Sequence, residues 1–144
     1  MDFLTALRIS GAGLGVERTR VNLATSNLAN AETTRTAAGG AYQRLDPVIQ
    51  AVAFPTELGE AGPSSSNPPL EAQVSAIVAD TTPGKRVYSP GHPDADPEGF
   101  VTFPNVNPVH EVVNLMSASR SYEANATAID TLKSMAQRGL DIAR

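Results

Sequence analysis

The densest group of side chains that could carry chemistry is an acidic loop, Asp94-Ala-Asp96-Pro-Glu98-Gly99. Alternating carboxylates followed by glycine are typical of the first half of a calcium-binding loop, which ends in a bidentate glutamate at its twelfth position. In this chain the twelfth position is Asn105, and the flanking residues do not predict helices. We therefore interpret the loop as a turn rich in Asp, Pro and Gly, and we predict no metal.

Two histidines are the other candidates for catalysis or metal binding. His92 lies in a Pro/Gly turn and His110 at the start of a predicted helix, and the chain has no cysteine to complete a zinc site. The Asn125-Ala-Thr127 sequence matches a glycosylation sequon, but Asn125 falls on a predicted packing face. The sequence predicts no catalytic residue and no cofactor. A small hydrolase using His92 or His110 is the alternative, which would lose activity when either is substituted.

Composition excludes several further classes of protein. The 144 residues carry a net charge of −4 with a pI near 5.1, so there is no basic surface for nucleic acid. No apolar run approaches the roughly 18 residues that span a bilayer, so we expect no membrane insertion. The first residues lack a basic segment followed by an apolar run, so no cleavable signal peptide is expected.

The N-terminal arm, residues 1–35, is predicted to be largely helical over 3–30 and apolar on two faces. Two apolar columns each repeat every seven residues: Leu7, Leu14, Val21 and Leu28, and Ile9, Val16 and Leu23. At 100° per residue the columns lie about 200° apart, on opposite faces of a helix. We expect the first column to pack on the chain's own C-terminal helix and the second to remain for a neighbouring subunit. Arg20 lies near the second face, and either reaches water or meets a carboxylate on a packed neighbour.

The C-terminal arm, residues 105–144, is predicted to be one long helix. Asn107 is a favourable N-cap, and Pro108 suits the first helical turn. Its apolar residues follow a coiled-coil-like rhythm, and those expected to meet the N-terminal helix are Leu115, Tyr122, Ile129 and Leu132. A weaker column, assigned to the subunit interface, consists of Ala128, Met135 and Ile142. Helices with two apolar faces need neighbours on both sides, so we expect assembly.

The middle, residues 36–104, is rich in turn-forming Gly, Pro and Ser. Strands are expected at 42–54 (broken by Pro47), 73–79, 86–88 and 100–103, and 59–70 are expected to form a mobile loop. The predicted fold class is therefore α+β, with long terminal helices packed as a coiled-coil-like pair and a small loop-rich β module inserted between them.

Three sequence stretches resemble the rod and hook family of the bacterial flagellum, and within it the proximal-rod branch. One is the Ser-Asn-Leu-Ala-Asn signature near the N-terminus, another is Val87-Tyr-Ser-Pro-Gly-His-Pro-Asp-Ala-Asp96, and the third is Met-Ser-Ala-Ser-Arg-Ser-Tyr near the C-terminus. The motif residues carried by the first and third stretches are Ser26, Asn27, Leu28, Ala29, Asn30, Ser117, Ala118, Ser119, Arg120, Ser121 and Tyr122.

The resemblance implies a non-enzymatic structural subunit of the periplasmic rod, the drive shaft between motor ring and hook. It implies helical assembly with copies of itself, with other proximal and distal rod proteins and with a FliE-type adaptor. It also implies export by the flagellar type III apparatus without a cleaved signal peptide. The alternatives are another axial subunit of the same family and a soluble type III secretion substrate.

Overall fold

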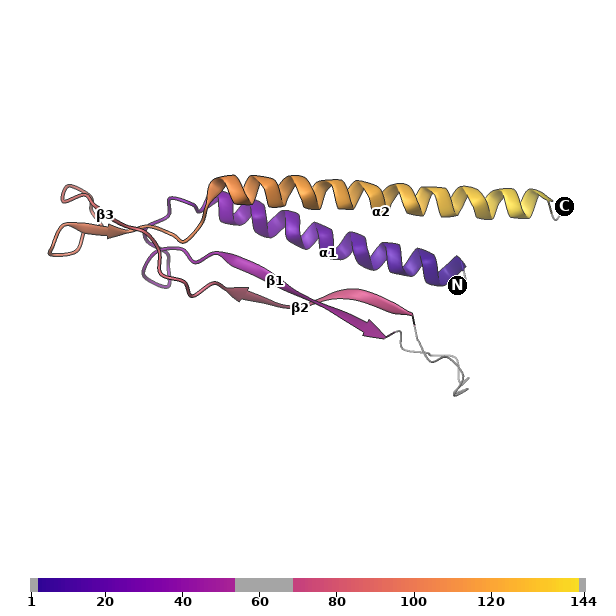
Figure 1. Cartoon of the computed structure of the whole chain (residues 1–144), viewed down its shortest axis with the longest axis horizontal. Helices are drawn as coiled ribbons and strands as arrows, with labels where there is room; N and C mark the ends of the chain where they lie inside the picture. The colour runs from indigo at the N-terminus through magenta and orange to yellow at the C-terminus, as the bar shows by residue number, and fades with distance from the viewer. Residues whose placement is uncertain (1–2, 54–68, 143–144) are drawn as a thin grey trace.

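Two long antiparallel helices form the body of the molecule, which is a computed structural model describing residues 3–53 and 69–142. Helix α1 spans Phe3–Ala29 and helix α2 spans Pro108–Ile142, and they lie side by side with both chain termini toward the same end (Figure 1). Asn107 is the N-cap of α2, because its Oδ1 accepts hydrogen bonds from the backbone N–H groups of Val109 (3.0 Å) and His110 (3.4 Å). The predicted helical arms and this cap are confirmed.

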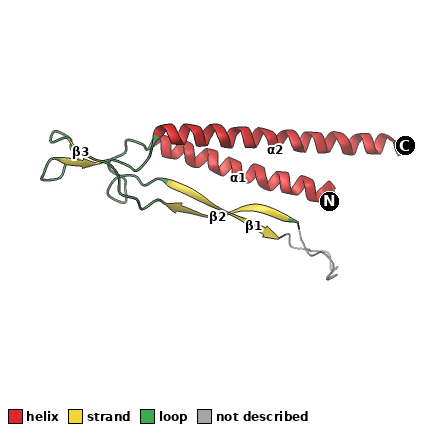
Figure 2. Cartoon of the chain, viewed as in Figure 1, coloured by secondary structure: helices red, strands yellow, loops and turns green. Residues whose placement is uncertain are grey.

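The predicted β module between the helices consists of two β-hairpins (Figure 2). Strands β1 (Leu45–Ala53) and β2 (Leu70–Ala79) pair antiparallel and run along α1, with a register shift between Val48 and Ile49. Strands β3 (Arg86–Tyr88) and β4 (Phe100–Thr102) pair antiparallel. They project from the end of the molecule that lies away from the two chain termini (Figure 1). The predicted α+β class is confirmed. Most of the predicted mobile loop, 59–68, lies outside the described residues.

Pro47 interrupts neither the first hairpin nor its register. It lies within β1 opposite Ile77, although proline cannot donate a ladder hydrogen bond. A two-stranded ribbon has only edge strands, and proline is tolerated where the missing N–H would face outward. The strand predicted to be broken at this residue is therefore continuous from Leu45 onward.

The buried core is small for a chain of this length. The buried apolar residues in the part of the chain described here are Val16, Leu23, Ala24, Val101, Pro104 and Ala118. Many larger apolar residues stay exposed, since a pair of helices and a two-stranded ribbon offer few enclosed positions. The folded chain therefore leaves much apolar surface exposed.

The assignment of one face of α1 to a neighbouring subunit was wrong for two of its residues. Val16 is only 6% exposed and Leu23 is also buried, within the chain itself. Val16 faces a hollow shared with the β2 residues Ala72 and Val74, and Leu23 faces one shared with Leu45 and Pro47 of β1. The error arose because sequence periodicity identifies a second apolar face but does not identify what covers it; here the first hairpin folds back onto α1.

Glycine permits close contact between the helices at one position of α1. A Cβ built on Gly13 would lie 3.0 Å from Nδ2 of Asn125 in α2, whereas one built on Gly15 would meet nothing within 4 Å. The two helices therefore pack closely at Gly13. We expect Gly15→Ala to raise the free energy of unfolding by up to about 1 kcal/mol, because alanine favours helix.

Gly13→Ala gains the same propensity but must displace Asn125, so we expect it to be less stable than Gly15→Ala by about 1 kcal/mol or more. Urea unfolding followed by circular dichroism compares the pair directly. Equal stabilisation by the two substitutions would contradict the close contact.

Candidate functional site

A buried polar cluster holds the end of α1, the start of β1 and the start of α2 together. At its centre Asn27 of α1 and Glu111 of α2 are each only 1% exposed. Their side chains meet through a 3.1 Å hydrogen bond from Asn27 Nδ2 to Glu111 Oε2. A buried carboxylate and a buried amide are costly unless they are hydrogen-bonded, so their other partners decide whether the cluster is stable.

Asn27 uses its full hydrogen-bonding capacity. Besides donating to Glu111, its Nδ2 donates to the carbonyl of Leu45 at 2.9 Å. Its Oδ1 accepts from the Leu45 N–H at 2.9 Å and from the Tyr42 hydroxyl at 3.0 Å. An asparagine side chain offers two donor hydrogens and one oxygen with two lone pairs, and all four are occupied here. Asn27 thus hydrogen-bonds both backbone groups of Leu45, the first residue of β1, and fixes that strand to α1.

Glu111 is neutralised by an arginine from the start of β1. Arg44 Nε donates to Glu111 Oε1 at 2.7 Å, and the same guanidinium also pairs with Asp46. The hydrogen bond to Glu111 is the main reason that the pKa of Arg44 is raised, with burial acting in the opposite direction. No buried side-chain nitrogen or oxygen in residues 3–53 and 69–142 is left without a hydrogen-bond partner.

Asn105 extends the cluster to the end of β2. Its Oδ1 accepts from the Arg44 N–H at 2.9 Å, and its Nδ2 donates to the Asp80 carbonyl at 3.1 Å. The Asp80 N–H in turn donates to the Arg44 carbonyl at 2.7 Å. We call the set Asn27, Tyr42, Arg44, Asn105 and Glu111 the polar junction. It fixes both helices and the first hairpin at one end of the molecule.

The predicted family motifs occupy two different environments. In the first motif Asn27 is in the polar junction, Asn30 donates from Nδ2 to the Ser26 carbonyl at 2.9 Å beside the end of α1, and the Ser26 hydroxyl lies 3.5 Å from that of Tyr42. In the second motif only Ala118 is buried, and Ser117, Arg120 and Tyr122 are exposed. The first motif is therefore mainly structural, whereas most of the second faces outward.

Most of the residues predicted for the helix seam and the subunit interface are half-buried, and a few are exposed. Leu7, Leu14, Val21, Leu28, Leu115, Ile129 and Leu132 are all half-buried, and Tyr122 is exposed beside a hollow it shares with Val21. Which of these residues contact one another stays a prediction.

Arg20 forms an ion pair with Glu17 on its own helix at 3.0 Å. From the sequence we expect it either to reach water or to meet a carboxylate on a packed neighbour, and this ion pair is neither. Ile9 and Ala128 are half-buried, while Met135 and Ile142 are exposed and remain predicted interface residues.

The residues first considered for chemistry have structural roles. Asp94 accepts a hydrogen bond from the Thr34 hydroxyl at 2.8 Å, and Asp96 Oδ1 accepts from the backbone N–H groups of Glu98 (3.0 Å) and Phe100 (2.8 Å). The bond from Phe100 is the main cause of a lowered Asp96 pKa. The turn interpretation is confirmed. Nowhere in the described ranges do three His, Cys, Asp or Glu side chains gather as metal ligands.

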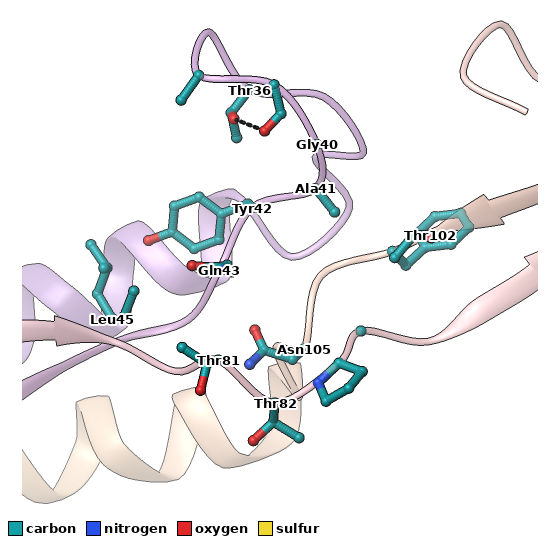
Figure 3. Close-up of a pocket in the computed structure, with 16 residues that line it drawn as sticks. Thr36, Gly40, Ala41, Tyr42, Gln43, Leu45, Thr81, Thr82, Thr102 and Asn105 are labelled. Carbon is teal, nitrogen blue, oxygen red and sulfur yellow. Dashed lines mark hydrogen bonds between the residues drawn. The ribbon is translucent and has the colours of Figure 1, made fainter. Parts of the chain in front are cut away.

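A hollow of about 520 Å³ lies beside the polar junction (Figure 3). It is lined by loops 36–43 and 79–84 and by residues near Asn105, without a single charged side chain or histidine among them. Threonine, glycine and alanine supply most of the lining, and none of these forms an acid–base pair. Among the helices of the described chain, none is both long and apolar enough to cross a membrane.

Four junction residues were missed from sequence: Tyr42, Arg44, Asn105 and Glu111. A signal existed for Glu111, because it lies seven residues before Ala118 and so falls on the same face of the predicted helix as that alanine. Asn27 likewise follows Leu23 by four residues, on the buried face of α1. A polar residue inside an apolar column predicts a buried, partnered group.

A thin helical pair, fixed by a polar junction and exposing apolar side chains, is typical of a structural subunit that neighbours complete. A family profile described as "Flagellar basal body rod FlgEFG protein C-terminal" matches residues 98–142. The chain is 38% identical to the flagellar basal-body rod protein FlgC of Salmonella typhimurium, over 99% of this chain and 98% of that one. It is 37% identical to FlgC of Bacillus subtilis over the full length of both, and 36% identical to FlgC of Borreliella burgdorferi over 99% and 98%. The chain belongs to the FlgC family of flagellar basal-body rod proteins.

Proposed function

We propose that this chain is a non-enzymatic structural subunit of the proximal rod in the flagellar basal body. It assembles helically through its terminal helices and forms part of the drive shaft that transmits torque from the motor ring to the hook. The relatives' rod-protein name and the architecture support this role together. Its partners are copies of itself, other proximal and distal rod proteins and a FliE-type adaptor. Export by the flagellar type III apparatus without a cleaved signal peptide belongs to the same proposal.

The observation that carries the proposal is the outer face of α2. Val109, Val112, Val113 and Met116 are all exposed over the first turns of this helix. The opposite face of the same turns is buried in the molecule through Glu111 and Ala118, so the exposed residues have no cover within the described chain. Four large apolar side chains on one helix face form a surface that favours burial against another subunit.

We expect Val113→Glu combined with Met116→Glu to abolish rod assembly while leaving the subunit folded. Both positions are exposed in the single chain, so the charges cost little there; in an interface each buried, unpaired carboxylate costs several kcal/mol. The measurement is recovery of rods in isolated basal bodies, together with swimming motility, in cells whose only copy carries the change. Thermal unfolding of the purified variant checks the fold.

Gln50→Glu, an exposed charge on β1, is the control and should preserve motility. Motile cells carrying both glutamates on α2 would contradict assembly through this face. A subunit that is secreted but stays soluble in wild-type cells would instead favour a type III substrate outside the rod.

A further inference from the structure

The β3–β4 hairpin is a projection that rests on neither helix. We call residues 85–102 the prong; it extends past the start of α2, away from the helical body (Figure 1). Among the described elements, β3 and β4 pack only on each other. The loop that joins β3 to β4 contacts the segment after α1, because Asp94 accepts a hydrogen bond from the Thr34 hydroxyl and pairs with Arg35 at 3.5 Å.

The prong is rigid although its surface is exposed. The Tyr88 and Phe100 rings meet edge to face with centroids 5.3 Å apart, and the Arg86 guanidinium lies 4.9 Å from the Phe100 centroid while pairing with Asp96 at 2.7 Å. Gly99 adopts a φ of +83°, and a Cβ there would come within 2.8 Å of the Tyr88 ring. Tyr88 is nevertheless 65% exposed. An exposed tyrosine whose ring is held by its neighbours loses little entropy on binding and is typical of an interface anchor.

The other end of the molecule carries an equally uncovered element. Two contacts fix the alignment of the antiparallel helices: Gly13 lies opposite Asn125, and Asn27 lies opposite Glu111. Continuing this alignment to the start of α1 places Phe3 opposite Met135. The last seven residues of α2, from Ala136 to Ile142, therefore extend past α1 by about 10 Å. We use the name overhang for residues 133–142, which are these seven residues and the three before them that still lie beside the start of α1; the exposed apolar side chains are Met135, Leu140 and Ile142.

Prong and overhang are complementary in charge as well as in apolar surface. The prong carries three carboxylates (Asp94, Asp96 and Glu98) against Arg86 and Lys85, so it is acidic by one charge. The overhang carries Lys133 and Arg138 against Asp141, so it is basic by one charge. Opposite charges at the rim of an apolar contact orient the partners more than they tighten binding.

The family profile indicates which partner carries the matching element. Its match, residues 98–142, includes the whole overhang but not Tyr88, and the profile is that of FlgEFG rod proteins. A C-terminal helix of this kind is thus common to rod proteins, whereas the tyrosine of the prong lies outside the shared region. The two elements also lie at opposite ends of the long axis, as contact between successive subunits requires (Figure 1).

We propose that the prong binds the C-terminal helix end of the next subunit along the rod, with Tyr88 seated among apolar side chains equivalent to those of the overhang. The partner is a rod subunit whose helix end is apolar with a basic rim. This inference rests on the proposed function, since it places the contact between rod subunits stacked end to end.

The test replaces Tyr88 by the photoreactive amino acid benzoylphenylalanine in otherwise intact cells. After irradiation of isolated basal bodies, mass spectrometry of the adduct should map it to the C-terminal helix of a second rod subunit. The matched control carries the label at Gln50, exposed on β1 and remote from the prong, and should not give this adduct. An adduct on any other region or protein, or assembled rods without an adduct, would overturn the inference.

Failure of this inference can be distinguished from failure of the proposed function. Rods that contain the labelled subunit already show that the chain is a rod subunit, whichever adduct forms. Should the label at Tyr88 prevent assembly, the same label at Glu98 gives the same measurement, since that side chain is 76% exposed on the prong. An adduct to a C-terminal helix end would again support the inference, and assembled rods without one would overturn it.

Discussion

Replacing Glu111 by alanine is expected to lower the free energy of unfolding by about 3 kcal/mol, enough to unfold much of a marginal domain. The substitution leaves the Arg44 guanidinium without its principal partner and the Asn27 amide without one acceptor. Asp46 still pairs with Arg44, which keeps the loss near the lower end of the range for broken buried ion pairs. Urea unfolding of the purified subunit, followed by circular dichroism, measures the change.

Two controls separate loss of the pair from loss of side-chain volume. Glu123→Ala removes an exposed carboxylate from the same helix and should change stability by less than about 0.5 kcal/mol. Arg44→Met combined with Glu111→Leu removes both charges and should recover most of the loss, because a buried ion pair is replaceable by apolar groups of similar size. If Glu111→Ala proved as mild as Glu123→Ala, the polar junction would not hold the helices together.

Asn27→Ala is expected to cost at least about 2 kcal/mol. It removes the side chain that satisfies both backbone groups of Leu45 and the Tyr42 hydroxyl, and an unsatisfied buried polar group costs about 1–3 kcal/mol. The matched control is Asn22→Ala, an exposed position in the same helix. Thermal and urea unfolding compare the pair, and amide exchange at Leu45 reports the lost anchor directly. Equal stability of the two variants, with Leu45 still protected, would show that β1 does not depend on Asn27.

The local elements were predictable from sequence because their signals are local. The seven-residue columns predicted both helices, Asn107 marked the start of α2, and the turn chemistry around 89–99 marked the second hairpin. The polar junction was not predicted because its partners lie far apart in the sequence; Asn27 and Glu111 are separated by 84 residues. The prediction that a neighbouring subunit covers Val16 was wrong for the same reason. No local pattern indicates that a two-stranded ribbon distant in sequence folds back onto a helix.

The small core has a thermodynamic consequence for the rod. Heat capacity increases on unfolding mainly in proportion to the apolar surface that becomes exposed. A subunit with six buried apolar residues in its described part exposes little such surface, so its own stability curve is shallow. In the assembly that we propose, the apolar surface exposed along α2 is buried between subunits. The temperature dependence of the rod therefore lies mainly in subunit association, and the largest heat capacity change belongs to polymerisation rather than to folding.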